Sequence, residues 1–262
     1  MRILMMTTYF APDSAANAVI MTQLAEDLAR LGHQITVVTS FPHYDQNRIP
    51  KRYRGRLWSK ERSGDLSICR LYLYVPKRKT GFIGRLANYA SWNLLSTLAG
   101  IMAKKFDLLF VPSPPLTNGA AGYAVSRIRG IPYVYNVQDI YPDIAVRLGV
   151  LKNKPMIGAF GRLERFVYRK AAAVSVLSEG FRSNLLAKGV PDRKIHVIPN
   201  FADTEFIRPL ARRNRLSASL GLDDRFVVLY AGNIGLSQGL EAVLDAAVLL
   251  KDHPDIVFLI VG

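Results

Sequence analysis

The sequence has 262 residues, half of them hydrophobic, and a formal net charge of +15. This hydrophobic content suffices for a packed core and excludes a disordered chain. The single cysteine, Cys69, excludes an internal disulfide and a cysteine-ligated metal cluster, so we expect a cytoplasmic, reducing location. Met1 to Phe10 lack the long apolar segment and cleavage site of a signal peptide and are interpreted as a strand.

The basic excess predicts attraction to phosphate, whether in nucleic acid, in anionic lipid headgroups or in a sugar nucleotide. An acidic second half would be the alternative explanation of the charge. No helix-turn-helix, RNA-recognition or zinc-finger pattern occurs, so we expect no nucleic-acid partner.

Strand and helix patterns alternate along the chain, which predicts an α/β fold with a parallel, doubly wound sheet. Gly32, Gly130 and Gly189 each follow a predicted helix, where a left-handed residue is needed. The predicted elements, in chain order, are a strand at 3–7, a helix ending near Leu31, a strand at 34–40, a basic loop at 48–62, a strand at 67–75, a helix at 82–104, a strand at 107–113, a helix at 117–129, a strand at 132–138, a helix at 155–170, a strand at 172–178, a helix at 179–188 and a strand at 194–199.

The pattern predicts one complete α/β domain at 1–206, an arginine-rich linker at 207–224 and a second unit at 225–262. The second unit opens as strand, helix and strand. Such a unit cannot bury both faces of a parallel pair, so we expect this domain to continue in a longer protein. The chemistry would then lie between the two domains, and this chain would be incomplete for catalysis.

The loop after the first strand, TTYFAPDSAAN at 7–17, contains no glycine. A dinucleotide-binding unit would carry G-x-G-x-x-G at this point. The sequence therefore argues against a NAD-dependent oxidoreductase.

Five segments together resemble the retaining glycosyltransferases of family 4, above all those that build O-antigen, capsule or exopolysaccharide repeats on a lipid carrier. They are YFAPDSAAN followed by LGHQITVVTS, PSPPLTNG at 112–119, NVQDIYPDIAVRLGVL at 136–151, VSVLSEGFRSNLLAKGVPDRKIHVIPNFADTEFIRP at 174–209, and LYAGNIGLSQGLEAVLDAA at 229–247. The resemblance implies a GT-B-like fold, in which a Rossmann-like N-terminal domain binds the acceptor and a second Rossmann-like domain binds the nucleotide sugar.

The same resemblance implies transfer of a hexosyl or N-acetylhexosaminyl group from a nucleotide-diphosphate sugar to a lipid-linked or polysaccharide acceptor. It implies a bacterial enzyme, peripheral at the inner face of the plasma membrane, with no metal and no cofactor besides the donor substrate. The competing hypothesis is a non-catalytic fragment that binds lipid or glycan precursor without turnover. The sequence departs from the family at the diphosphate clamp, where Asn233 and Gln238 replace an arginine and a lysine.

Two segments are candidates for the acceptor site. In the first loop, Ser14 or Asn17 could cap the following helix, whose N-terminus would attract an anion; ordinary capping without a ligand is the alternative. Asp139 follows a predicted strand and is the candidate catalytic base; the alternative is an N-cap or an ion pair within the next turn. The predicted acceptor-binding residues are Pro12, Asp13, Ser14, Asn17 and Gln138.

A glycine-rich loop between a strand and a helix is the candidate donor site. A tight turn in any fold is the alternative. The four histidines are scattered without a metal-binding spacing, so no metal ligand is predicted. The predicted donor-binding residues are Gly232, Asn233, Gly235, Gln238 and Gly239.

Residues 77–105 carry six basic side chains and no acidic one, which suits a helix that lies on an anionic membrane without crossing it. We expect Arg85, Trp92 and Leu95 to contact the membrane, and the basic loop at 48–62 to form a second patch. A plain core helix is the alternative. The opposite stripe is expected to pack on the sheet and consists of Leu86, Tyr89, Ala90, Leu94, Leu98 and Ile101.

Overall fold

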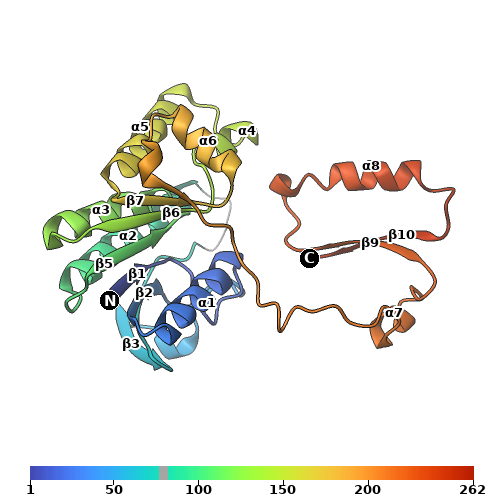
Figure 1. Ribbon diagram of the computed structural model, residues 1–262, viewed down its shortest axis with the longest axis horizontal. Helices are drawn as coiled ribbons and strands as arrows, with labels where there is room; N and C mark the ends of the chain where they lie inside the picture. The colour runs from blue at the N-terminus through green and yellow to red at the C-terminus, as the bar shows by residue number, and fades with distance from the viewer. Residues whose placement is uncertain (77–81) are drawn as a thin grey trace. The chain divides into compact units, whose positions relative to one another are not determined.

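The computed structural model describes residues 1–76 and 82–262 and divides into two compact units, residues 1–201 and 202–262 (Figure 1). The first unit holds an eight-stranded sheet in the order β3-β4-β2-β1-β5-β6-β7-β8, in which only β3 is antiparallel to its neighbour. Its strands are β1 (Arg2–Met6), β2 (Gln34–Ser40), β3 (Trp58–Ser63), β4 (Leu66–Leu71), β5 (Leu108–Pro112), β6 (Tyr133–Val137), β7 (Ala173–Val176) and β8 (Ile195–Val197).

Helices connect the parallel strands and cover both faces of the sheet. Asn153 and Ser178 cap α5 and α6, each accepting a hydrogen bond from a first-turn backbone N–H. Gly32, Gly130 and Gly189 have φ of 85°, 65° and 80°, which confirms the predicted left-handed positions. The helices are α1 (Ala16–Arg30), α2 (Phe82–Met102), α3 (Thr117–Arg129), α4 (Asp143–Arg147), α5 (Lys154–Lys170) and α6 (Glu179–Ala187), with 3-10 turns η1 (Lys51–Tyr53) and η2 (Asp192–Lys194).

The predicted strands and long helices are confirmed, but the interpretation of residues 48–62 as a loop is wrong. This segment contains η1 and most of β3, which pairs with β4 from Trp58 opposite Leu71 to Ser63 opposite Leu66. Tyr53 is buried, and its hydroxyl donates to Glu61 Oε1 at 2.7 Å. The strand WSKERS carries no apolar alternation because it is a charged edge strand, so its pattern resembles a loop.

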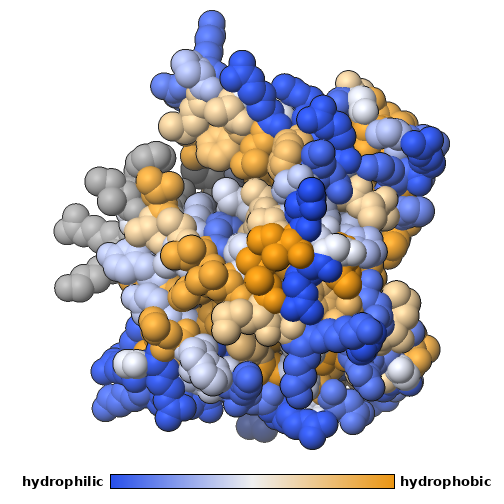
Figure 2. All heavy atoms as spheres, turned by 90° about the vertical axis from the view of Figure 1, so that its left-hand side faces the viewer, coloured by the Kyte–Doolittle hydropathy of each residue, from blue (hydrophilic) through white to orange (hydrophobic). Residues whose placement is uncertain are grey.

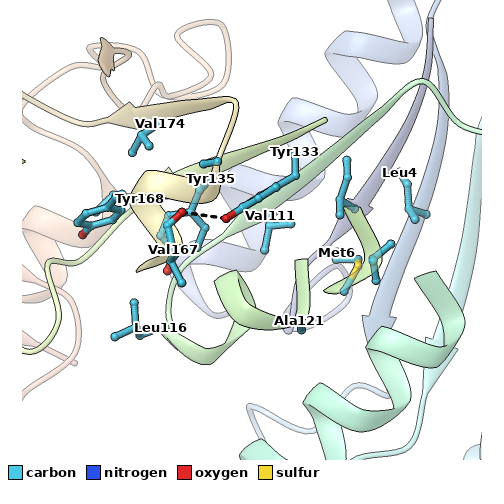
Figure 3. Packing of buried hydrophobic residues seen from close by; sticks show 14 of the residues in the cluster. Leu4, Met6, Val111, Leu116, Ala121, Tyr133, Tyr135, Val167, Tyr168 and Val174 are labelled. Atoms are coloured by element: carbon cyan, nitrogen blue, oxygen red, sulfur yellow. Dashed lines mark hydrogen bonds between the residues drawn. The ribbon is translucent and has the colours of Figure 1, made fainter. Parts of the chain in front are cut away.

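The core of the first unit consists of two clusters, one on each side of the sheet. Figure 3 shows the larger cluster, in which residues of β1, β5, β6 and β7 meet residues of α3 and α5. There the Tyr133 hydroxyl donates to the Val167 carbonyl at 2.8 Å, so its buried polar atom has a partner. The smaller cluster joins α1 to β1, β2 and β4. On the face drawn in Figure 2, hydrophobic side chains gather centrally and hydrophilic ones surround them.

The face of α2 that packs against the core is the opposite of the one predicted. Trp92 is 1% exposed and donates from its indole nitrogen to Asn118 Oδ1 at 2.8 Å, and Leu95 packs against the core. The predicted membrane contacts of Trp92 and Leu95 are therefore wrong, and the Arg85 side chain lies outside the described residues. Of the stripe expected to be buried, only Ile101 packs against the core. The exposed side chains of that stripe include Leu86, Tyr89, Leu94 and Leu98.

The inward face of α2 is selected by close packing. A Cβ added at Gly100 would lie 2.7 Å from Val125 Cγ2, so the helix approaches α3 as closely as glycine permits. Ser96, on the same face, is fully buried. Small residues and a tryptophan with a buried partner therefore face the core, although the other face carries more leucine.

The second unit contains the parallel pair β9 (Phe226–Ala231) and β10 (Ile256–Val261), which forms its own two-stranded sheet. Its helices are α7 (Arg215–Ser219), inside the segment predicted as a linker, and α8 (Glu241–Leu249), with the 3-10 turn η3 (Leu236–Gln238) between β9 and α8. Large apolar side chains of this unit remain exposed, among them Phe226, Leu229 and Val248. Much of the apolar surface of this unit is therefore exposed.

Two helical glycines predict opposite effects of the same substitution. At Gly119, in α3, an added Cβ would overlap a Val167 methyl group and lie 3.0 Å from Tyr135 Cε2. Gly119→Ala should therefore lower the free energy of unfolding by about 1–3 kcal/mol. At Gly158, in α5, an added Cβ would meet nothing within 4 Å. Gly158→Ala should raise the free energy of unfolding by about 0.5–1 kcal/mol.

Urea unfolding of the two variants beside the parent chain measures both differences. Equal effects of the two substitutions would contradict the packing of α3 against α5 described here.

Candidate functional site

The predicted acceptor-site residues lie at the carboxyl edge of the first sheet. Strand β1 lies between β2 and β5, and the chain leaves it through α1 toward β2 but reaches β5 from β4 through α2. The loops after β1 and β5 therefore leave the sheet toward opposite faces, and open α/β sheets bind ligands at such a switch point. Asp139 and Gln138 follow β6, the next strand beyond β5.

Asp13 fastens the loop after β1 to the loop after β2. It is buried, and its Oδ1 accepts hydrogen bonds from the backbone N–H groups of His43 at 2.9 Å and Tyr44 at 3.0 Å. Burial raises the pKa of the Asp13 carboxyl, and these hydrogen bonds oppose the rise. Beside it, Ser14 donates to Asp45, while Pro12 is exposed. Asp13 thus holds the loop after β1 against the loop after β2, and Pro12 is the neighbouring loop residue exposed to solvent.

The N-terminus of α1 has no side-chain cap. Its N-cap residue is Ala15, so the prediction that Ser14 or Asn17 caps this helix is wrong. The amide nitrogen and oxygen of Asn17 are both buried without a hydrogen-bond partner in the part of the chain that the structure describes. An uncapped helix N-terminus attracts anions, and Asn17 adds an unused donor and acceptor beside it.

Aromatic residues that the sequence analysis did not single out line the same loops. Tyr9 stacks on His43 with ring centroids 5.3 Å apart and meets Tyr44 edge-on at 5.5 Å. Burial raises the pKa of Tyr9 to about 12. His43 Nδ1 lies 2.9 Å from the Phe41 carbonyl oxygen. His43 follows β2 at the carboxyl edge, so the rule that selected Asp139 could have found it.

A buried arginine binds the backbone of the loop after β1. Arg70, in β4, is 4% exposed; its Nε donates to Glu61 Oε2 at 2.7 Å and its Nη2 to the Ala11 carbonyl at 2.6 Å. The ion pair with Glu61 joins β4 to β3, and the hydrogen bond to Ala11 joins β4 to the loop that contains Pro12. The role of Arg70 could not be predicted from local sequence, because this arginine lies inside an apolar strand pattern.

Gln138 ties three strand ends together. Its backbone N–H donates to Ser113 Oγ at 3.0 Å, after β5, and its side-chain amide donates to Asn136 Oδ1 at 2.7 Å. Asn200, after β8, donates in turn to Gln138 Oε1 at 2.9 Å. Both polar ends of the Gln138 side chain are therefore engaged within the protein. Asn200 was not predicted, although it lies in the fourth of the five family-like segments.

Asp139 follows Gln138 at the same edge of the sheet. It is partly buried, and it accepts no hydrogen bond and forms no ion pair among residues 1–76 and 82–262. Burial raises the pKa of its carboxyl group. The next helix, α4, has Pro142 as its N-cap without a side-chain cap, so Asp139 does not cap it. The structure thus groups Gln138 with Asp139 after β6, and Pro12 to Asn17 after β1.

The predicted donor-site residues lie together in the second unit, in the loop from β9 to α8. The Gly232 N–H donates to the Val261 carbonyl at 2.9 Å, and Tyr230 donates to the Asn233 carbonyl at 2.7 Å. Gly235 precedes η3, and Gln238 ends it. Gly239 has a left-handed φ of 59°, so this position requires glycine for the turn. Helix α8 begins at Glu241, just after the start predicted near Gln238.

Neither 1–76 nor 82–262 contains a group of three or more His, Cys, Asp or Glu side chains arranged to hold a metal ion. Likewise, none of the helices described has both the length and the apolar character needed to cross a bilayer.

The mostly parallel α/β sheet of the first unit and the solved structures that share its fold place the chain in the GT-B class of folds. Comparison with known proteins identifies the family: the model of the glycosyl transferase 4-like domain matches residues 17–200. The chain belongs to this family, which confirms the resemblance to family 4 glycosyltransferases of polysaccharide biosynthesis.

Individual relatives agree with this assignment. The colanic acid biosynthesis glycosyl transferase WcaI of Escherichia coli K12 is 29% identical over 275 residues, an alignment that covers all of this chain and 66% of the relative. Sucrose-phosphate synthase from Thermosynechococcus elongatus matches with a TM-score of 0.69 at 17% identity, over 100% of this chain and 62% of that one. Anabaena HepE in complex with UDP-glucose matches with a TM-score of 0.62 at 16% identity, over 99% and 60%. At these identities the solved structures establish the fold, and the chain spans less than two thirds of each relative's length.

The Gln138–Asn200 pair predicts coupled effects on stability. Gln138→Ala and Asn200→Ala each remove one side of the same amide pair, so the second substitution should cost less in the variant that already lacks the first. We expect a coupling free energy of about 0.5–1 kcal/mol from urea unfolding of the parent, both single variants and the double variant. Strictly additive effects would show that the two loops are not joined by this contact.

Proposed function

We propose that the protein is a retaining glycosyltransferase. It moves a hexosyl or N-acetylhexosaminyl group from a nucleotide-diphosphate sugar to a lipid-linked or polysaccharide acceptor in the biosynthesis of cell-surface polysaccharide. Family membership supports the reaction class, and the relative WcaI is named for colanic acid, a polysaccharide. HepE, which shares the fold, was solved with UDP-glucose, so a UDP-sugar is the first donor to test.

The observation that carries this proposal is the unpartnered carboxylate of Asp139 at the carboxyl edge of the sheet. In the reaction, an acceptor hydroxyl oxygen bonds to the anomeric carbon while the bond from that carbon to the diphosphate oxygen breaks. The electron pair of the broken bond leaves with the nucleotide diphosphate, and the hydroxyl proton needs an acceptor. A carboxylate with a raised pKa is a better proton acceptor than an ordinary one.

The acceptor would lie between Asp139 and the loop that contains Pro12 and Asn17. Asn17 has unused hydrogen-bonding atoms, and the uncapped start of α1 suits a phosphate on a lipid carrier. Asp13 and Gln138 hold the two loops in place through the contacts described above. Attack on the same face as the leaving group follows from the family resemblance.

The first experiment measures sugar transfer by the complete protein, with UDP- and GDP-sugars and a polyprenyl-linked acceptor. Asp139→Asn should lower the transfer rate about 10²–10⁴-fold, the usual contribution of a general base.

Because burial raises the folded-state pKa of Asp139, its ionised form destabilises the fold at pH 7. The variant should therefore be more stable than the parent at pH 7, with the difference disappearing as the pH falls below the unfolded value near 3.8.

Asp143→Asn is the matched control. Asp143 lies four positions further on, but its carboxylate pairs with Lys188 at 3.0 Å and accepts from Asn184 at 3.0 Å. This variant should lose stability at pH 7 and keep the transfer rate. An Asp139→Asn protein with full transfer activity would overturn the assignment of the base.

We further propose that the protein works at the inner face of the plasma membrane, bound through the exposed face of α2. Leu86, Leu94 and Leu98 are 58%, 63% and 47% exposed on this face, and Met102 ends the helix 82% exposed. Lys104 and Lys105 follow directly and are exposed, which suits anionic headgroups. The membrane contact is therefore proposed for the exposed leucines of α2 in place of Trp92 and Leu95, which are on the face toward the core.

Leu94→Asn with Leu98→Asn tests this surface. Each exposed leucine that enters a bilayer contributes about 1.5 kcal/mol, so the double variant should bind vesicles containing phosphatidylglycerol roughly a hundredfold more weakly. Val19→Asn on α1, where Val19 is 49% exposed, is the control and should bind like the parent. Sedimentation with vesicles measures both. Equal binding by all three proteins would exclude α2 as the contact.

A non-catalytic, precursor-binding role is the second candidate. It is favoured by the neutral side chains of Asn233 and Gln238 in the donor loop and by the acidic Glu241 in the first turn of α8. Failure of the complete protein on every donor would support this role over transfer.

A further inference from the structure

A basic hollow of about 450 Å³ lies between α5 and the segment that joins α6 to β8. Among the described residues that line it, five are basic and none is acidic. The basic residues are Arg162, Arg165, Arg169, Lys188 and Lys194.

The two lysines already have partners within the fold. Lys188 Nζ lies 2.7 Å from Glu164 Oε1 and also pairs with Asp143. Lys194 Nζ donates to the carbonyl groups of Arg169 at 2.8 Å and Ala171 at 2.9 Å, at the end of α5. These contacts fix the walls of the hollow.

The three arginines have no such partners. Arg162, Arg165 and Arg169 follow one another at spacings of three and four residues, so they share one side of α5. All three are exposed, and within the described chain none forms a hydrogen bond or an ion pair through its guanidinium group. Like charges at these spacings repel one another, and an anion between them would relieve that repulsion.

The hollow lies at the opposite edge of the sheet from the candidate acceptor site. Helix α5 ends at Lys170, just before β7 begins at Ala173, and the segment 188–194 leads into the start of β8 at Ile195. Asp139 and Asn200 lie at the other ends of these parallel strands. Neither Asp139 nor Asn200 is among the residues that line the hollow.

We propose that this hollow is a second anion site, which binds the phosphate groups of a phosphate ester. Guanidinium groups present paired N–H donors that match phosphate oxygens, and three of them face one hollow. The volume exceeds what a phosphate ion needs and falls within the range of small-molecule sites. Phe166 and Val190 supply an apolar wall for the organic part of the ligand. A soluble phosphate ester and a phospholipid headgroup share this chemistry.

The test compares the parent chain with the triple variant Arg162→Gln, Arg165→Gln, Arg169→Gln. Pyrophosphate, followed by calorimetry, probes a soluble ligand, and vesicles containing phosphatidylglycerol probe a headgroup. We expect the variant to bind at least one of the two probes at least tenfold more weakly. Because the three side chains are exposed, its thermal unfolding should match that of the parent.

The control variant Arg208→Gln, Arg212→Gln, Arg215→Gln removes the same charge from the second unit and should bind like the parent. A loss confined to pyrophosphate supports a soluble phosphate ester, and a loss confined to vesicles supports a lipid headgroup. Equal weakening by both triple variants would show a general charge effect and overturn the site. Unchanged binding of both probes by the α5 variant would overturn it as well.

Discussion

The position of β1 between β2 and β5 is the constraint on which the candidate site depends. The chain turns one way from β1 and the other way from β4, so α1 lies on one face of the sheet and α2 on the other. The loops after β1 and β5 consequently diverge toward opposite faces of the sheet. Hydrogen bonds then join the strand ends. The Gln138 backbone N–H donates to Ser113 after β5, its side-chain oxygen accepts from Asn200 after β8, and Asn118 of α3 donates to the Pro112 carbonyl at 3.2 Å.

Helix α2 shows why an apolar stripe alone does not identify the buried face. Both of its faces carry large apolar residues, so hydrophobic periodicity has no single maximum to follow. The buried face is decided by two contacts that need tertiary structure: the indole N–H of Trp92 finds Asn118, and Gly100 lets the helix approach Val125. Leu94 and Leu98 lie on the other side of the helix and remain exposed.

Much of the fold could be predicted because central parallel strands are apolar on both faces and helices separate them. The helix at 117–129 was predicted at its observed bounds, while the edge strand β3 was missed because its residues are charged. At the site, Asp139 was predicted from its position after a strand together with the family resemblance, and the same positional rule applied to β2 would have selected His43 as a candidate. The contacts of Asn200 with Gln138, and of Arg70 with Ala11, join residues 62 and 59 positions apart, so no local pattern contains them.

The distribution of charge separates the candidate site from the basic surfaces. Around the carboxyl edge of the first sheet the side-chain contacts include amides, hydroxyls, carboxylates and the His43 imidazole, and the buried Arg70 is paired with Glu61. The glycine loop after β9 is neutral, and Glu241 follows it. A diphosphate held there would depend on backbone N–H groups, which carry no net charge and are not screened as exposed cations are. Part of the net charge of +15 instead lies on exposed surfaces such as the arginine face of α5.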